Sequence, residues 1–441
     1  MTKQVMLQKE ISKKKIAFHT LGCKLNFAET STISRSFPEE SFERVPASSG
    51  ADIYIINTCS VTDAADRKCR QAIKKFIHQS PGAFIAVVGC YAQLNPGKIA
   101  SIPGVDLVLG SNEKFDIGKY LDNFNKKKSA EVHSDDHSPE ERFFQSFSMG
   151  DRTRSFLKIQ DGCDYGCSYC TIPMARGNSR NPSIESITEE ALKIAGTGIK
   201  EVVLTGVNIG DFGKSTGDDF EKLLRDLIDI EGIERYRISS VEPNLLSDSI
   251  IELVSNNNKI LPHFHMPLQS GCDRILALMR RRYRRKVFEE RVKKITDLMP
   301  LAGIGADVIV GFPGETENDF NETYSFLSDL PLSYLHVFSF SERPGTVAAE
   351  MKDKVSSAFK EERSKILQSL SDKKHLDFCL RNTGTQAEVL FEHTRSAGRM
   401  TGFTGNYIRV EHPWDSSLTG KIISMKLSEI LPGGRMGGEI I

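Results

Sequence analysis

The chain has 441 residues, of which 39% are hydrophobic and 26% are charged, a composition typical of folded globular proteins. Basic and acidic residues both number 58, so the formal net charge is zero, which excludes a uniformly basic nucleic-acid-binding coat. No apolar run reaches the roughly eighteen residues of a membrane helix, and the lysine-rich residues 1–15 lack the apolar core of a signal peptide. We therefore expect no membrane association and a cytoplasmic location.

Residues 1–125 alternate short apolar runs with segments of helical composition. The expected strands are residues 15–19, 52–56, 84–88 and 106–109, and the expected helices are residues 26–37 and 62–79. This alternation predicts a small parallel α/β domain. Residues 126–150 contain a lysine run and then an acidic stretch, which predicts an exposed linker between two domains.

A longer series of the same kind occupies residues 151–375. Strands are expected at 156–160, 201–205, 236–239, 264–267, 305–310 and 335–340, and helices at 187–195, 220–228, 248–254, 274–280 and 319–327. Six βα units are fewer than the eight that close a TIM barrel, so the sequence predicts an open, partial (βα)6 barrel. A charged helix at 358–378 is expected to lead out of this domain.

The last segment, residues 376–441, has the sequence pattern of an all-β domain. Short strands are expected at 386–391, 399–403, 406–411 and 418–425, separated by turn signals such as Gly405-Asn406. The overall fold class is therefore α/β, with a small antiparallel β-barrel of OB-like form at the C-terminus.

Three cysteines lie within eight residues, directly after the first strand of the second domain. Cys163, Cys167 and Cys170 form a C-x3-C-x2-C run, and thiolates at this spacing bind zinc or an iron–sulfur cluster. A structural zinc ion takes four protein ligands, and this loop supplies no fourth cysteine or histidine. The run therefore favours a four-iron cluster with one open iron, with zinc as the alternative.

This loop resembles the signature of the radical S-adenosylmethionine enzymes, with Tyr169 as the aromatic residue before the third cysteine. The resemblance implies that the three cysteines hold a 4Fe-4S cluster whose open iron binds S-adenosylmethionine. One-electron reduction then cleaves the cofactor to a 5′-deoxyadenosyl radical, while the protein orients the cofactor and excludes water. The partial barrel is the fold that this family uses.

Polar residues and glycines follow successive strands of the expected barrel, at the edge where such barrels bind ligands. For any one glycine, an ordinary turn is an equally good interpretation. The residues expected to bind the cofactor are Tyr169, Gly206, Asn208, Glu242, Gln269, Gly311 and Phe312.

A second trio of cysteines is spread over the first domain. Cys23, Cys59 and Cys90 each lie two to four residues beyond an expected strand. If the strands are parallel, all three cysteines lie at one edge of the sheet, where their thiolates converge. The alternative is that they are ordinary buried cysteines.

The segments around this second trio resemble the N-terminal domain of the methylthiotransferases: Thr20–Asn26, Asn57–Thr62 and Val88–Gln93. The resemblance covers nearly the whole chain, including a C-terminal TRAM domain. It implies that Cys23, Cys59 and Cys90 hold an auxiliary 4Fe-4S cluster that carries the sulfur to be inserted. The remaining Cys69, Cys272 and Cys379 are expected to be structural, with a low-pKa Cys272 as a minor alternative.

Residues 24–26, Lys-Leu-Asn, are similar to the branch that acts on threonylcarbamoyladenosine in tRNA, as is the segment after Cys59. The resemblance implies insertion of a methylthio group at C2 of this nucleoside at position 37, beside the anticodon. It also implies an external one-electron donor similar to flavodoxin or ferredoxin. The alternatives are isopentenyladenosine in tRNA, an aspartate of a small-subunit ribosomal protein, or a non-catalytic iron–sulfur protein that binds RNA or senses redox state.

A basic run offers separate support for an RNA substrate. Its cations are Arg280, Arg281, Arg282, Arg284, Arg285 and Lys286, and they are expected to contact the phosphates of a tRNA anticodon stem-loop. A solvated helix face is the alternative. In the C-terminal domain, Phe391, Phe403 and Tyr407 have the chemistry to stack on splayed bases, although a place in the barrel core is the favoured interpretation.

Overall fold

The structure is a computed structural model that describes residues 13–120, 124–134, 142–150 and 152–441. The chain forms two compact units, residues 1–138 and residues 139–441, and each is described by itself. Among the described residues, no helix combines the length and the apolar character needed to cross a membrane.

The first unit is built on one parallel sheet of six strands in the order β2-β1-β3-β4-β5-β6. Its strands are β1 (Lys14–Thr20), β2 (Phe42–Arg44), β3 (Ile53–Thr58), β4 (Phe84–Gly89), β5 (Leu107–Leu109) and β6 (Glu131–His133). The central strands β3 and β4 are buried along their whole length, which explains their continuous apolar runs. The predicted parallel α/β domain is confirmed.

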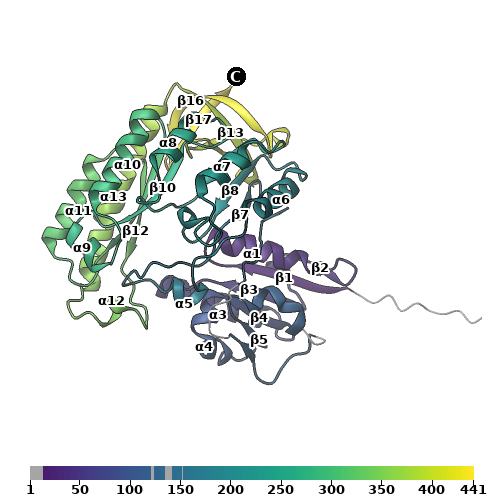
Figure 1. Cartoon of the computed structure of the whole chain (residues 1–441). Helices are drawn as coiled ribbons and strands as arrows, with labels where there is room; N and C mark the ends of the chain where they lie inside the picture. Colours follow the sequence, from purple (N-terminus) through teal and green to yellow (C-terminus); the bar gives the residue numbers. More distant parts are fainter. Residues whose placement is uncertain (1–12, 121–123, 135–141, 151) are drawn as a thin grey trace, which may run out of the picture. The chain divides into compact units, whose positions relative to one another are not determined.

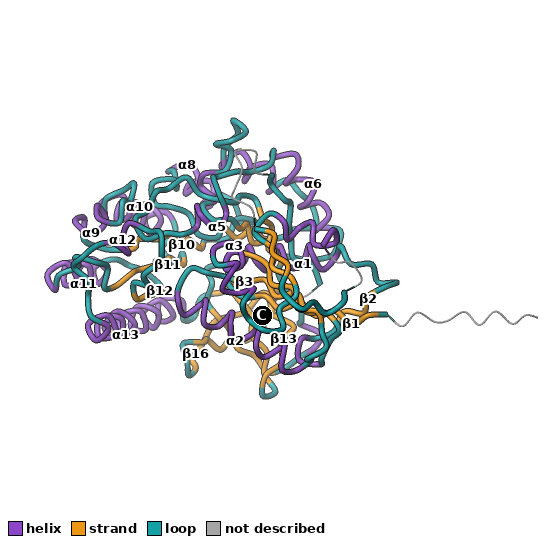
Figure 2. The backbone as a smooth tube through the Cα atoms, turned by 90° about the horizontal axis from the view of Figure 1, so that it is seen from below, coloured by secondary structure: helices purple, strands orange, loops and turns teal. Residues whose placement is uncertain are grey.

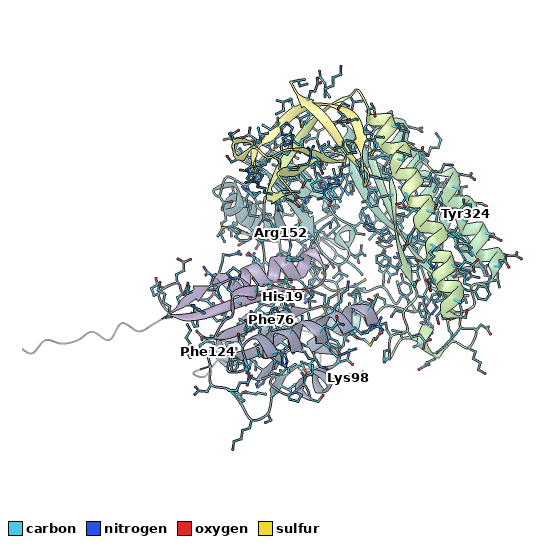
Figure 3. The ribbon with its side chains drawn as sticks, turned by 180° about the vertical axis from the view of Figure 1, so that it is seen from behind. His19, Phe76, Lys98, Phe124, Arg152 and Tyr324 are labelled. Carbon is cyan, nitrogen blue, oxygen red and sulfur yellow. The ribbon has the colours of Figure 1, made fainter. Side chains whose placement is uncertain are left out.

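Helices pack on both faces of this sheet. They are α1 (Lys24–Arg35), α2 (Asp63–Gln79), α3 (Cys90–Leu94) and α4 (Pro96–Ala100). Phe76 of α2 stacks on Tyr54 of β3 with ring centroids 4.8 Å apart. His19 of β1 packs edge-on against the Phe76 ring (Figure 3). These contacts fix α2 against the strands whose ends carry the cysteines.

The predicted linker of residues 126–150 is partly wrong, because β6 lies within it. Residues 131–133 pair in parallel with β5, and Lys126 and Lys127 are bound by the buried carboxylate of Asp106. This segment therefore supplies a neighbouring strand for β5 and hydrogen-bond donors for the buried Asp106 carboxylate. Sequence patterning missed the strand because Glu-Val-His contains one apolar residue, whereas the equally short β5 is Leu-Val-Leu.

The second unit contains the expected partial barrel. Its strands are β7 (Ser155–Lys158), β8 (Glu201–Thr205), β9 (Arg235–Ile238), β10 (His263–Gln269), β11 (Gly303–Val310) and β12 (Tyr334–Ser339). They form two parallel three-stranded sheets, β7-β8-β9 and β10-β11-β12. Isolated parallel bridges from Tyr236 to Ile260 and from Ser240 to His265 connect the two sheets. The prediction of an open (βα)6 barrel is confirmed.

Helices cover the outer side of these strands, as Figures 1 and 2 show for α10, α11 and α13 beside β10 and β12. The helices are α5 (Ile172–Arg176), α6 (Ile184–Ala195), α7 (Phe220–Ile228), α8 (Asp248–Ser255), α9 (Asp273–Leu278), α10 (Arg285–Leu298), α11 (Glu317–Asp329), α12 (Val347–Glu350) and α13 (Ser357–Asn382). Several of these helices begin at a Ser, Thr or Asp that accepts a hydrogen bond from a backbone N–H three residues on.

The C-terminal segment forms a closed barrel in the order β13-β14-β15-β17-β16. Its strands are β13 (Gln386–Ser396), β14 (Arg399–Thr404), β15 (Arg409–Pro413), β16 (Ile422–Leu431) and β17 (Arg435–Ile440). Sequence patterning predicted the first four and missed β17, whose two glycines weaken the strand pattern. The expected small β-barrel is confirmed.

A buried charge cluster joins this barrel to the strands β8 and β9. Glu201 is fully buried, and its carboxylate faces Arg237 at 2.8 Å, Arg235 at 3.8 Å and Arg154 at 3.9 Å. Arg237 also donates to the carbonyl oxygens of Gly405 at 2.8 Å and Thr404 at 3.1 Å. Arg154 also pairs with Glu392 of the C-terminal barrel at 3.1 Å, so two carboxylates and the barrel carbonyls together balance the three arginines.

Two aromatic residues of the C-terminal barrel belong to this junction. Tyr407 stacks on Phe403 and on His263 of β10, with ring centroids 4.9 Å and 4.5 Å apart, and the Arg237 guanidinium lies 4.7 Å from the Tyr407 ring. Phe391 is fully buried in the barrel core. The favoured interpretation, a place in the barrel core, is confirmed for Phe391. Phe403 and Tyr407 are half-buried in the junction, where packing already uses their rings.

Replacing Glu201 by Ala tests this junction. Burial would raise the pKa of Glu201, but the three arginines hold it below its ordinary value. The carboxylate therefore stabilises the fold above about pH 4.3, and this stabilisation is lost as the pH falls. We expect Glu201→Ala to lower the free energy of unfolding at neutral pH by about 3–5 kcal/mol in chemical denaturation, because the buried Arg235 and Arg237 lose their carboxylate partner while Arg154 keeps Glu392.

The matched control is Glu221→Ala, which removes an acidic residue that pairs with Arg225 at the surface of α7. Its effect should stay within about 0.5 kcal/mol. Equal effects of the two substitutions would contradict the role assigned to Glu201.

Candidate functional site

The three cysteines of the C-x3-C-x2-C run lie in the loop between β7 and α5, and all three are partly exposed. Each sulfur accepts a hydrogen bond from a nitrogen donor: Cys163 from the Tyr165 N–H at 3.4 Å, Cys170 from the Ile172 N–H at 3.4 Å, and Cys167 from the Arg281 guanidinium at 3.2 Å. Such donors stabilise thiolates.

Burial and mutual repulsion oppose the ionisation of these thiols. Burial, and then the charges of the other two cysteines, raise the pKa of Cys163 to about 12, and burial raises that of Cys170 to about 11. Three thiolates at this spacing need a cationic partner to be stable near neutral pH. The donor set therefore fits a metal centre with three protein ligands, as a 4Fe-4S cluster with an open iron requires.

The start of the cysteine loop is fixed by a buried aspartate. Asp161 forms ion pairs with Lys158 at 2.6 Å, Arg176 at 2.9 Å and Arg180 at 3.3 Å. Its carboxylate also accepts a hydrogen bond from the Gly162 N–H at 2.8 Å. Burial would raise the pKa of Asp161, but these cations hold it well below the ordinary value. The loop is therefore anchored immediately before its first cysteine.

Arg281 connects the cysteine loop to the rest of the site. Its guanidinium is buried, forms an ion pair with Glu242, and lies 3.5 Å from the Tyr169 hydroxyl and 3.2 Å from that of Tyr283. Tyr283 in turn donates to the backbone carbonyl of Leu268 at 3.0 Å. Arg281, which the sequence analysis predicted to contact RNA, thus connects Cys167 with two predicted cofactor residues, Tyr169 and Glu242.

The loop after β8 is held by Gln160, which sequence analysis did not single out. The Gln160 side-chain oxygen accepts the backbone N–H groups of Val207 at 2.9 Å and Asn208 at 2.8 Å. A Cβ added to Gly206 would lie 3.0 Å from the Gln160 carbonyl oxygen, so close packing accounts for this glycine. Asn208 is buried and donates to Asp211 at 2.9 Å.

The other predicted cofactor residues lie after β10 and β11. Gln269 ends β10 with a φ of 68°, and Gly311 follows β11 with a φ of 72°. The Phe312 ring is fully buried, and it meets Phe340 edge-on at 5.3 Å. Direct contact between the Phe312 side chain and a cofactor is therefore not compatible with its position, and packing explains this residue.

The basic run occupies the turn after α9 and the start of α10. The Arg281 side chain is only 4% exposed, which is not compatible with a phosphate contact, and Arg285 forms an ion pair with Glu322 at 2.6 Å. Arg282 lies over the Tyr165 ring at 4.0 Å and donates to the Asp164 carbonyl at 2.9 Å. The exposed members of the run are Arg280, Arg282, Arg284 and Lys286.

The second trio of cysteines lies at one edge of the sheet in the first unit. The strands pair so that Thr20 faces Asn57 and Asn57 faces Val88, which brings the ends of β1, β3 and β4 level. Cys23 follows β1 at the N-terminus of α1, Cys59 follows β3, and Cys90 is the first residue of α3. Burial, and then the charges of Cys23 and Cys90, raise the pKa of Cys59 to about 12. This set also fits a metal centre with three ligands.

Asn26 ties the cysteine-bearing segments together. It is completely buried, its amide donates to the carbonyls of Leu21 at 2.8 Å and Thr58 at 3.0 Å, and its oxygen lies 3.9 Å from the Cys23 sulfur. The segments before Cys23 and Cys59 therefore cannot move apart without breaking these bonds. In the sequence, this role of Asn26 is indicated by its position three residues after a cysteine at the start of a helix.

The three remaining cysteines are buried. Cys69 donates to the Cys59 carbonyl at 3.3 Å, and Cys272 donates to the Asp319 carboxylate at 3.2 Å. Burial is the main cause that raises the pKa of Cys69, Cys272 and Cys379 to about 11 each. The alternative of a low-pKa Cys272 is therefore wrong, and the structural interpretation agrees with these positions.

Replacing Gly22 by Ala tests the auxiliary site. Gly22 has a φ of 105°, and an added Cβ would lie 2.5 Å from the Cys59 Cβ and 3.0 Å from its sulfur. We expect Gly22→Ala to displace Cys59 and to remove about four irons per chain after anaerobic reconstitution, as measured by iron and sulfide analysis. Gly82→Ala is the control, since nothing lies within 4 Å of its added Cβ, and it should keep its iron.

Replacing Arg281 by Gln tests its hydrogen bond to Cys167. Loss of the positive charge should destabilise the reduced cluster and lower its midpoint potential by roughly 60 mV, equivalent to about 1.4 kcal/mol for one electron. EPR-monitored redox titration in a Cys59→Ala background, which leaves one cluster, measures this shift. Arg280→Gln removes a neighbouring exposed arginine and should leave the potential unchanged, and an unchanged potential in Arg281→Gln would contradict the assignment.

The chain matches two family models, one in each unit. Residues 15–110 match the model of the uncharacterized protein family UPF0004, and residues 157–327 match the radical SAM superfamily. The radical S-adenosylmethionine methyltransferase TsrM from Kitasatospora setae, solved with cobalamin and a [4Fe-4S] cluster, has a similar fold. Its TM-score is 0.54 at 12% identity, over 76% of this chain and 77% of that one.

Two relatives extend the match over nearly the whole chain. The threonylcarbamoyladenosine tRNA methylthiotransferase MtaB of Bacillus subtilis (strain 168) is 39% identical over 93% of both chains. The protein of the same name from Aquifex aeolicus (strain VF5) is 40% identical over 90% of this chain and 96% of that one. The chain belongs to the radical S-adenosylmethionine methylthiotransferase family.

Proposed function

We propose that this protein is the methylthiotransferase that modifies N6-threonylcarbamoyladenosine at position 37 of tRNA, next to the anticodon. The observation that carries this proposal is the pair of convergent three-cysteine sites in a chain that matches enzymes of that name over nine-tenths of its length. The reaction replaces the C2–H of the adenine by C–SCH3. This bond offers no useful acid at neutral pH, so the conversion requires radical chemistry.

The chemistry comes from two 4Fe-4S clusters and S-adenosylmethionine, which supply a 5′-deoxyadenosyl radical, a methyl group and the inserted sulfur. We propose that Cys163, Cys167 and Cys170 hold the radical cluster and that Cys23, Cys59 and Cys90 hold the auxiliary cluster. As members of the catalytic machinery, these six cysteines provide ligands and leave one iron of each cluster open.

The protein's own contribution at the radical site is charge and orientation. Arg281 is permanently cationic and donates directly to Cys167, so it offsets part of the negative charge of the thiolates. Burial raises the pKa of Glu242, and its ion pair with Arg281 keeps the carboxylate in place. We propose that Glu242 binds the amino group of S-adenosylmethionine, with Gly206, Asn208, Gln269 and Gly311 lining the remainder of the cofactor site.

The tRNA contact is proposed for the exposed part of the basic run. Arg280, Arg282, Arg284 and Lys286 are exposed, and Arg282 reaches the cysteine loop through its bond to the Asp164 carbonyl. Cations placed there can neutralise phosphates of an anticodon stem-loop whose target base has left its stack. We further propose an external one-electron donor of flavodoxin or ferredoxin type, and a cytoplasmic location.

The decisive experiment uses reconstituted enzyme, dithionite, S-adenosylmethionine and two anticodon stem-loops, one with threonylcarbamoyladenosine and one with isopentenyladenosine. We expect the methylthio product only from the first RNA, detected by mass spectrometry of nucleosides. In the Cys59→Ala variant, 5′-deoxyadenosine should still form while the methylthio product disappears, because only the auxiliary site is lost.

Other outcomes identify the competing functions. Methylthiolation of the isopentenyladenosine RNA, or of an aspartate in a small-subunit ribosomal protein, would reassign the substrate within the family. Absence of 5′-deoxyadenosine from a protein with full iron content would overturn the enzymatic function and leave a non-catalytic iron–sulfur protein.

A further inference from the structure

Two histidines and an aspartate converge on one side of the sheet β10-β11-β12. His265, Asp307 and His336 each come from a different strand, and Asp307 and His336 are direct neighbours in the register of β11 and β12. Side chains on adjacent strands that point to the same face lie close together. Sequence analysis did not predict this cluster, because the three residues are about 30 to 40 positions apart.

The spacing of the three polar atoms suits a metal ion. The Asp307 carboxylate oxygen lies 2.9 Å from His265 Nε2 and 3.2 Å from His336 Nδ1, and one potential ligand atom from each residue lies within 4.8 Å of the other two. Two ligands bound at about 2.1 Å and separated by about 90–110° are roughly 3.0–3.4 Å apart. Both measured contacts to Asp307 are close to this range.

The other nitrogen of His265 has a partner that orients the ring. The Tyr334 hydroxyl lies 3.1 Å from His265 Nδ1, and the two rings stack with centroids 5.9 Å apart. Metal-binding histidines characteristically use their second nitrogen in this way, which directs the first nitrogen toward the metal. Tyr334 also lies 2.9 Å from His263 Nε2, so its own position is fixed.

The cluster is accessible and close to the proposed active centre. The His336 side chain is 55% exposed and that of Asp307 is 21% exposed, so an ion can enter without rearrangement of the core. The backbone N–H of Val241, the residue before Glu242, donates to the His265 carbonyl at 3.0 Å, so the cluster lies beside the segment that carries Glu242.

We propose that His265, Asp307 and His336 form a binding site for one divalent transition-metal ion, in addition to the two iron–sulfur centres. Two imidazoles and one carboxylate suit Fe²⁺, Co²⁺ or Zn²⁺ better than Mg²⁺ or Ca²⁺, which favour oxygen ligands alone. Three protein ligands leave coordination positions open for water or an oxygen of a bound molecule. The site stands on its own geometry and does not rest on the proposed tRNA substrate.

A cobalt-binding experiment tests the site in the full chain with both clusters assembled. Wild-type protein and three variants, Asp307→Asn, His336→Ala and His78→Ala, are dialysed anaerobically to equilibrium against micromolar Co²⁺, and cobalt and iron are counted by elemental analysis. His78 is exposed on α2 in the other unit and serves as the matched histidine control. Equal iron in all four proteins shows that the clusters are intact.

We expect one more cobalt ion per chain in wild type and His78→Ala than in Asp307→Asn and His336→Ala. Cobalt bound to surface groups or leftover thiols is common to all four proteins and cancels in this difference. His336→Ala removes a mostly exposed side chain, so we expect the variant to fold normally and its cobalt content to report on the metal site. Equal cobalt in all four proteins would overturn the metal site and leave a hydrogen-bonded His–Asp–His cluster.

Discussion

Repulsion among closely spaced thiolates is the constraint on which both candidate centres depend. At each site one thiol, Cys59 or Cys163, has its pKa raised first by burial and further by the charges of the other two cysteines. A polypeptide gains nothing from such an arrangement unless a cation compensates the charge. The fold supplies part of that compensation at the radical site through Arg281, and bound metal must supply the rest at both sites.

The two units achieve the convergence of cysteines in different ways. In the second unit the three cysteines are close in sequence, and a loop anchored by Asp161 is sufficient to gather them. In the first unit they are far apart in sequence, and a parallel sheet with level strand ends brings them together, assisted by the close approach at Gly22 and the bonds of Asn26. A local motif is robust to changes elsewhere, whereas the distributed site depends on the register of the whole sheet.

Sequence patterning recovered the architecture because buried parallel strands are long apolar runs, and it placed the cysteine motif correctly after β7. It failed where the apolar pattern was weak, as in β6 with one apolar residue and β17 with two glycines. Arg281 was hidden among other cations, since charge alone does not reveal that one side chain of a run turns inward. The His265, Asp307 and His336 cluster depends on tertiary register, which no single-sequence period encodes.

The arginines around Glu201 also decide what kind of module the C-terminal barrel is. Arg237 reaches two backbone carbonyls of that barrel, and Tyr407 from the same barrel covers His263. If the barrel moved as a flexible RNA-binding module, each movement would break these contacts and leave buried guanidinium N–H groups without hydrogen-bond partners. The barrel is therefore a fixed part of the second unit, and a truncation before β13 would take away the carbonyl partners of Arg237 and the ring that covers His263.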